Sequence, residues 1–265
     1  MMMTKRTFAA AALAMAAAAL PGAAQQQSPL TQVMTCIKVL PGKAAEFAEV
    51  SAIAAKMYKA RVDAGKLRSW TQLRSEFPRG SEARCDYMSS SIYEGAPPPP
   101  PSRADTEKAL RDGGANMTVA EYFAKRDAVS RRVSTEMWRI RELAGALAKG
   151  HYVSLNYMKV HDAADYAEFE HSVWRPMADT MVKEGAMSSW VFATKMYPSG
   201  TETAYAAYSA DVFPTWEAAM RPRNNQAAFE KAHPGKNYQQ TMTRLGKLRE
   251  LAQRQLFVVA DRVSK

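Results

Sequence analysis

The strongest constraint on the fold of this chain is a motif that occurs twice, 120 residues apart. Residues 65–82 read GKLRSWTQLRSEFPRGSE, and residues 185–202 read GAMSSWVFATKMYPSGTE. Both fit G-x-[LM]-x-S-W-x6-[FY]-P-x-G-[ST]-E without a gap, and six of the aligned residues are identical. Because Trp, Pro and Gly are individually uncommon, this agreement indicates that the chain contains two copies of one structural unit.

The similarity extends on both sides of the motif. Upstream, residues 35–39 (TCIKV) and 156–160 (NYMKV) occupy the same place, and each is followed by apolar residues at helical spacing. Gly65 and Gly185 then stand where a helix is expected to stop. Downstream of each Pro-x-Gly turn, a segment rich in Tyr, Ser and small apolar residues predicts a further strand.

A second helix is expected in each copy. Thr118 and Glu121 form a capping box, and apolar residues recur at helical spacing from Val119 to Ala144. In the second copy the corresponding helix is expected to end in LRELA (248–252), and the last strand spans 256–263. Each unit therefore reads strand, helix, strand, strand, helix, with a closing strand clear only at the C-terminus.

That order predicts an α+β fold made of two tandem ferredoxin-like repeats. A single repeat covers only one face of its sheet with helices. The other face is apolar and needs a partner, so we expect the two sheets to pack against each other. The expected boundaries are 25–148 and 149–265, and the proline-rich loop at 96–102 is expected to be a solvated spacer.

The first 24 residues are expected to be a signal peptide. Lys5 and Arg6 precede an apolar run from Phe8 to Leu20, which is too short to cross a bilayer, and small residues fit a cleavage site before Gln25. The mature chain is therefore expected in the periplasm or outside the cell, with no membrane attachment after cleavage. In an oxidising compartment Cys36 and Cys85 are either a disulfide or two small buried residues, and the sequence leaves both open.

The net charge of the whole chain is +10. Lysine and arginine are spread along the sequence rather than packed into one run, and no nucleic-acid-binding motif is present. The charge therefore permits an acidic ligand, and we expect no nucleic-acid partner.

The element order, the duplication and the aromatic strand residues resemble the dimeric α+β barrel superfamily, and the repeated motif is similar to that of a group of exported bacterial proteins. The superfamily includes antibiotic-biosynthesis-type monooxygenases, stress-responsive barrel proteins, muconolactone isomerases and chlorite-dismutase relatives. The resemblance implies a ligand site inside the barrel, between a sheet face and the helix or loop that covers it. No catalytic residue can be assigned from the resemblance, because the sequence contains no haem-ligand histidine pattern and no monooxygenase signature. We expect no bound cofactor.

Alternation along the strand of each motif separates two sets of side chains. Leu67, Ser69, Thr71 and Leu73 suit packing under helices, which would turn Trp70, and likewise Trp190, toward the barrel interior or the interface between repeats. The two tryptophans are candidate walls of an apolar ligand pocket. The alternative is that they hold the two repeats together.

Four further residues are candidate ligand contacts. Lys38 and Lys159 stand at the ends of the first strands, where an ammonium group either binds an anion or lies in solvent. Asn156 and Tyr157 are polar groups in a strand expected to be central, so each needs a partner from the protein or from a ligand.

Histidine offers one weak candidate for catalysis. His161 follows a strand near the expected barrel mouth and could transfer protons. Glu168 and His171 have a spacing that metal sites use, but one such pair supplies only two ligands, so we expect no metal site. Pro176 lies within the expected helix of the second copy only and should kink it, which would make the two halves unequal and allow one pocket rather than two.

These features predict an exported protein, monomeric with internal pseudo-twofold symmetry, that binds a small molecule between its two sheets. One alternative is a cofactor-independent monooxygenase or isomerase acting on a polar aromatic substrate. Another is a structural or stress-related protein whose interior is filled. The sequence leaves open whether the chain is an enzyme.

Overall fold

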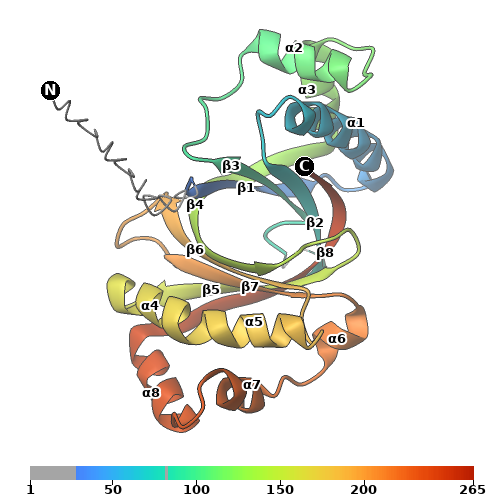
Figure 1. Cartoon of the computed structure of the whole chain (residues 1–265). Coiled ribbons are helices and arrows are strands. Elements are labelled where there is room, and N and C mark those ends of the chain that lie inside the picture. Colours follow the sequence, from blue (N-terminus) through green and yellow to red (C-terminus); the bar gives the residue numbers. More distant parts are fainter. Residues whose placement is uncertain (1–27, 81–82) are drawn as a thin grey trace, which may run out of the picture.

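Eight antiparallel strands close into a barrel in the computed structural model, which describes residues 28–80 and 83–265 (Figure 1). The order around the barrel is β1-β3-β2-β8-β5-β7-β6-β4. The strands are β1 Leu30–Val39, β2 Ser69–Phe77, β3 Tyr87–Glu94, β4 Ser130–Gly145, β5 Tyr152–Val160, β6 Ser189–Tyr197, β7 Ala207–Phe213 and β8 Arg249–Ser264.

The barrel consists of two equal sheets joined at both edges. Each repeat contributes four strands in the order fourth, first, third, second, which is the ferredoxin-like arrangement. The second strand of each sheet then pairs with the last strand of the other, through β2 with β8 and β6 with β4. The prediction of two tandem ferredoxin-like repeats forming an intramolecular α+β barrel is confirmed.

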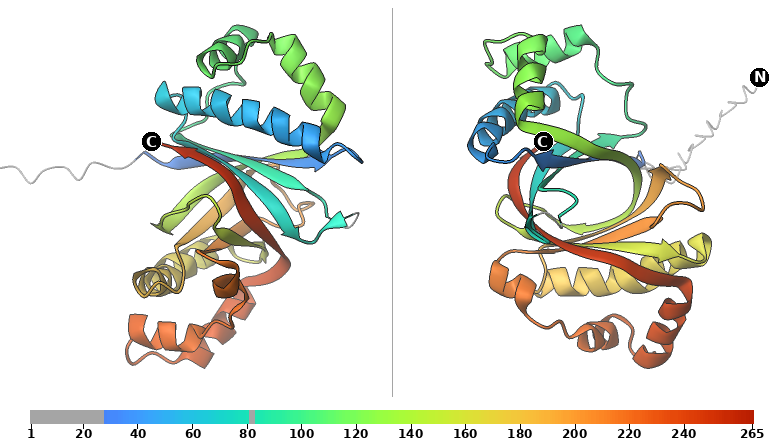
Figure 2. Two further views of the ribbon diagram at one scale, coloured as in Figure 1. Left: turned by 90° about the vertical axis from the view of Figure 1, so that its right-hand side faces the viewer. Right: turned by 180° about the vertical axis from the view of Figure 1, so that it is seen from behind.

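Helices lie only outside this ring, above one sheet and below the other (Figures 1 and 2). The first sheet is covered by α1 Ala44–Asp63, α2 Arg103–Asp112 and α3 Val119–Val129. The second is covered by α4 Ala163–Phe169, a π-helix at Glu170–Trp174, α5 Arg175–Lys183, α6 Trp216–Met220, α7 Asn225–Ala232 and α8 Tyr238–Leu248. None of these helices in the described part of the chain has the length and apolar character needed to cross a membrane. The expected signal peptide at 1–24 lies outside the described residues.

The second helix of each repeat is shorter than the sequence predicted. The helix expected to reach Ala144 ends at Val129, and the one expected to reach residue 252 ends at Leu248. Each continues directly into a long strand, so the first repeat does have a closing strand. The apolar stripe misled because Trp138, Ile140 and Ala144 also satisfy strand alternation, and together with Glu136 they are buried along β4.

The orientation predicted for the two tryptophans is wrong. Leu73 packs in the barrel interior, so alternation turns Ser69 and Thr71 inward as well, while Trp70 and Trp190 point outward beneath the helices. The reason is steric. Large rings from other strands already fill the barrel, so β2 has small side chains on its inner face. The buried interior rings are Trp138, Tyr157, Tyr205, Tyr208 and Phe257.

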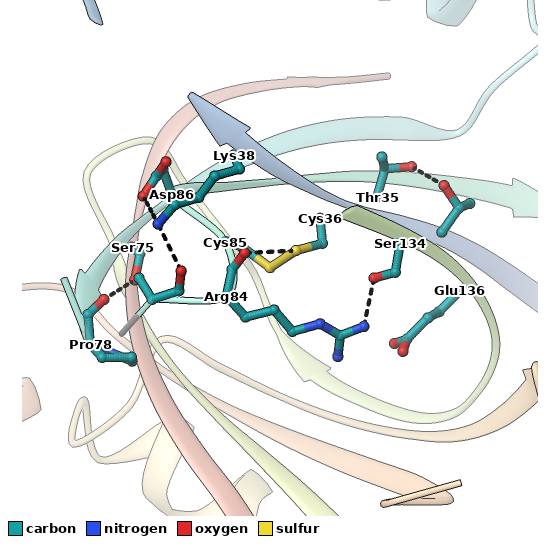
Figure 3. The surroundings of a disulfide bond; sticks show 12 residues. Thr35, Cys36, Lys38, Ser75, Pro78, Arg84, Cys85, Asp86, Ser134 and Glu136 are labelled. Carbon is teal, nitrogen blue, oxygen red and sulfur yellow. Dashed lines mark hydrogen bonds and ion pairs between the residues drawn. A yellow bond between two sulfur atoms is a disulfide. The ribbon is translucent and has the colours of Figure 1, made fainter. Parts of the chain in front are cut away.

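A disulfide joins Cys36 of β1 to Cys85, which precedes β3, and this answers the question that the sequence left open (Figure 3). Both residues belong to the apolar interior of the barrel. Cys85 lies outside the strand, so alternation does not direct it to the opposite face. The bond ties the connection between β2 and β3 to the neighbouring strand.

Removing this disulfide should destabilise the fold. The Cys36→Ser/Cys85→Ser double variant loses a cross-link between residues 49 positions apart, and the free energy of unfolding should fall by about 2–4 kcal/mol. Urea unfolding followed by far-UV circular dichroism would measure it, with the wild type under strong reductant as control. Coincident curves for the oxidised wild type and the variant would contradict the prediction.

Candidate ligand site

Two cavities of very different size lie on the two faces of the first sheet. The one inside the barrel has a volume of about 20 Å³, enough for a single water molecule. The one outside, between the sheet and helices α1 to α3, has a volume of about 580 Å³, within the range of small-molecule sites. The expected position of a ligand between the two sheets is therefore occupied by protein side chains, and the available space lies under the helices.

The larger cavity runs along α1. Apolar side chains of this helix line it from above, among them Phe47, Val50, Ala54 and Met57. The proline run Pro97–Pro101 lines it as well, so this segment forms part of the cavity wall and is more than a solvated spacer. Helix α2 follows the prolines directly and was not expected from the sequence.

A stacked aromatic pair forms one wall of the cavity. Tyr58 of α1 lies parallel to Trp70 of β2, with ring centres 4.8 Å apart and an angle of 10° between the planes. The indole Nε1 of Trp70 donates a hydrogen bond to Ser89 Oγ at 2.8 Å, which fixes the ring against the sheet. Burial raises the pKa of Tyr58, so its hydroxyl is a neutral donor at physiological pH.

Polar groups are set among these apolar walls. Gln72 accepts a short hydrogen bond from the hydroxyl of Ser51, and Thr35, Ser89 and Ser91 add hydroxyls from the sheet. A few convergent polar groups in an apolar cavity are what orients a bound small molecule.

Tyr122 and two arginines lie toward the α3 and β4 side of the cavity. Burial raises the pKa of Tyr122 to about 12, while the positive charges of Arg126 and Arg132 act in the opposite direction. All three side chains line the cavity.

The corresponding space in the second repeat is filled. Counted back from the ends of the two long helices, Ala54 matches Trp174, and the motif aligns Gln72 with Phe192. Trp174 and Phe192 both pack in the apolar cluster under the second set of helices. Larger side chains in the second repeat thus occupy the volume that is open in the first.

The π-helix at Glu170–Trp174 accompanies this difference. The helix of the second repeat runs without a break from Ala163 to Lys183 and is one residue longer than α1, so the π-helix accommodates one extra residue. Arg175 N–H bonds to Glu170 O across the wider turn, and Pro176 follows at the start of α5. The π-helix precedes Pro176 and occurs in the second repeat, so the long helices of the two halves differ.

Glu170 begins a buried polar cluster in the second repeat. It is 2% exposed, and burial raises its pKa to about 8. Arg249 and Tyr166 act on the same carboxyl group and lower the pKa, whereas Asp211 raises it. Asp211 also accepts a hydrogen bond from Asn156 at 2.9 Å, so the expected need of Asn156 for a partner is met within the protein.

The remaining predicted contacts are dispersed. Lys38 donates to Gly80 O and to Asp86, at 2.9 and 3.0 Å, and thereby holds the connection between β2 and β3 (Figure 3). Lys159 lies at the surface, 3.9 Å from Glu250. Of the six predicted ligand contacts, Trp70 lines the large cavity.

Tyr157 and His161 lie elsewhere. Tyr157 lines the small interior cavity, with its ring centre 4.4 Å from that of Tyr205. His161 lies at the surface with Nε2 3.2 Å from Glu250 Oε1, and it borders neither cavity.

The interior of the barrel holds a compact ionic group. Lys195 Nζ is 3.3 Å from Glu136 Oε1 and 3.5 Å from the centre of the Tyr205 ring. Burial lowers the pKa of Lys195, and the charge of Glu136 raises it in return. Tyr205 donates a hydrogen bond to Glu136 and accepts one from Arg84. These mutual contacts satisfy the charges and make the group part of the packed interior.

In the described part of the chain, no three His, Cys, Asp or Glu side chains are placed to hold a metal ion. The pair Glu168 and His171 is not used together. His171 Nδ1 lies instead 2.7 Å from Glu142 Oε1 of β4.

Comparison with known proteins bears on the fold. No family model matches the sequence, and no curated protein matches it. A solved structure from Lactobacillus acidophilus matches with a TM-score of 0.54 at 10% identity, covering 90% of this chain and 97% of that one. Another from Fusobacterium nucleatum matches with a TM-score of 0.53 at 11% identity, covering 91% and 96%. Both are described as putative monooxygenases.

This chain has the dimeric α+β barrel fold. Both matches span nearly the whole of each chain, so the duplicated barrel of this protein corresponds to the complete architecture of its structural neighbours. At such low identity the likeness concerns the fold.

The buried carboxyl group should make the stability of the barrel depend on pH. Burial raises the pKa of Glu170 from its ordinary value of 4.5 to about 8 in the folded chain, so the folded state holds the extra proton between these values. Its stabilising contribution is complete below pH 4.5 and is lost as the pH rises toward 8, by on the order of a few kcal/mol.

Urea unfolding between pH 5 and 8.5 would measure this effect. In Glu170→Gln the slope against pH should be flatter, because the amide stays neutral, whereas Glu168→Gln, an exposed neighbour on the same helical segment, should keep the wild-type slope. Equal slopes in the wild type and Glu170→Gln would show that Glu170 does not titrate as stated.

Proposed function

We propose that this barrel protein is a cofactor-independent monooxygenase that binds a small hydroxylated aromatic substrate in the cavity under α1 to α3. The observation that carries the proposal is the 580 Å³ space, with the Tyr58–Trp70 stack on one side and hydroxyl and amide groups on the sheet. The description of two structural neighbours as monooxygenases supports the choice of reaction. The position differs from the site expected between the sheets.

Such a reaction needs no electron carrier, because the substrate supplies the electrons. In a substrate with an acidic methylene group, CH₂ and O₂ give C=O and H₂O, which balances atoms and electrons. The protein has to favour loss of the first proton and keep the resulting anion away from bulk water. Arg132 supplies positive charge at the cavity, which stabilises a developing enolate or phenolate.

The walls of the cavity provide positioning. The aromatic pair offers a flat surface for a ring, and Gln72 and Ser91 offer hydrogen bonds to its substituents. Asp105 also lines the cavity, and hydrogen bonds from Ser102 lower the pKa of its carboxyl group, so that a carboxylate is available there to accept the proton.

Oxygen uptake would test the proposal. With 1,8-dihydroxyanthrone as the probe, the wild type should consume O₂ faster than buffer alone, in a one-to-one ratio to quinone formed. Ala54→Trp, which places an indole ring in the cavity as at the matching position of the second repeat, should abolish the excess rate. Asp105→Asn, which removes the proposed base, should lower the rate about 100-fold.

The outcome separates the three functions considered. Binding of the probe without O₂ uptake would make the chain a binding protein, and neither binding nor uptake would favour a structural role. Uptake that persists in Ala54→Trp would place any reaction outside this cavity.

We also propose that the protein works outside the cytoplasm. The basic and apolar residues at the start of the sequence support this, as does the Cys36–Cys85 disulfide, since disulfides persist in oxidising compartments. When the full chain is expressed in a Gram-negative host, the periplasmic fraction should contain a protein that begins at Gln25. Deleting residues 1–24 should retain the protein in the cytoplasm. Uncleaved chain in the cytoplasm would contradict the proposal.

A further inference from the structure

The charge around the large cavity is unbalanced. Its lining includes three arginines, Arg61, Arg126 and Arg132, and one carboxylate, Asp105. Arg126 is neutralised by Asp127, with Nη2 and Oδ1 2.7 Å apart. Arg61 lies near Asp105, whose pKa its charge helps to lower. Arg132 forms no ion pair with any residue in the described part of the chain, so its charge at the cavity is left for a ligand.

The second repeat shows what occupies the matching positions when the space is closed. Ser51 and Glu170 hold the same place counted from the helix starts at Ala44 and Ala163, and the motif register aligns Ser91 with Asp211. Each carboxylate has an arginine beside it, since Asp211 lies 2.8 Å from Arg223 and the charge of Arg249 acts on Glu170.

In the filled repeat, therefore, acidic side chains of the chain itself occupy the space under the helices. Asp211 forms an ion pair there with Arg223, and Glu170 lies beside Arg249 with its proton retained. In the open repeat both acidic residues are replaced by serines, while cationic side chains remain at the cavity. The first repeat therefore lacks the negative charge that Asp211 supplies in the second.

We infer that the ligand of the large cavity is an organic anion, whose acid group binds Arg132 beside the hydroxyl of Tyr122 and whose apolar body lies along α1. The inference deepens the proposed function and rests on the use of that cavity. Arg132 is exposed whereas Tyr122 is buried, so the acid group lies at the solvent side and the apolar body occupies the space beneath Val50 and Ala54. The guanidinium group suits a carboxylate or sulfonate because it presents paired donors.

A matched pair of dyes tests the charge requirement. 8-Anilinonaphthalene-1-sulfonate and N-phenyl-1-naphthylamine share one apolar body and differ by the sulfonate group, and both fluoresce when bound in an apolar site. The wild type should bind the sulfonate at least tenfold more tightly than the neutral dye. Arg132→Gln should weaken binding of the sulfonate by about tenfold to a hundredfold and leave the neutral dye unchanged.

Two controls locate the effect. Arg131→Gln removes the same charge from the adjacent residue, which does not line the cavity, and should leave both dyes unaffected. Ala54→Trp should abolish binding of both dyes, because it fills the space under α1.

Equal affinity for the two dyes, or an equal effect of Arg131→Gln and Arg132→Gln, would overturn the inference while leaving the cavity as the proposed site. Binding of neither dye, or binding that survives Ala54→Trp, would overturn both the inference and the proposed function.

Discussion

Pairing between the edge strands of two sheets determines how the rest of this molecule is arranged. Because β2 pairs with β8 and β6 with β4, each sheet is completed by the other and their inner faces enclose one space. Aromatic side chains such as Trp138 and Tyr208 fill that space. Once the interior is packed, a site for a small molecule has to lie on an outer face, between sheet and helices.

The outer faces are where the two repeats differ. At the positions that match Ala54 and Gln72, the second repeat has Trp174 and Phe192, whose aromatic rings pack in the space under its helices. Glu170, the first residue of the π-helix, is buried as well. One copy has a packed core at this place and the other has a cavity, so the two repeats share one order of strands and differ in the space under their helices.

Much of the fold could be predicted from the sequence because the repeat appears twice at full length. The limits of the prediction have physical causes. Ile140 and Ala144 fit the helical spacing and also, together with Trp138, the alternation of a strand, and only pairing of β4 with β1 and β6 decides between the two. The inward or outward direction of Trp70 depends on what fills the barrel, which strand alternation alone does not reveal.

The candidate site was harder to find. Trp70 was singled out, but Tyr58, Ser91 and Arg132 were not, because each is an ordinary residue for a helix or strand. The sequence does contain a signal, in the comparison of aligned positions. Where one copy has a small side chain and the other a large one, the copy with the small side chain retains space. The clearest example is Ala54, which aligns with Trp174.

The pairing of β8 with β2 also affects how the chain is made. The partner of residues 69–77 lies at 256–264, so this edge of the first sheet has no partner until nearly the whole polypeptide has left the ribosome. Contacts between such distant segments form slowly, and an unpaired edge is prone to associate with other chains in the meantime. The first sheet therefore keeps an unpaired strand edge during most of synthesis, until the residues of β8 are available to close the barrel.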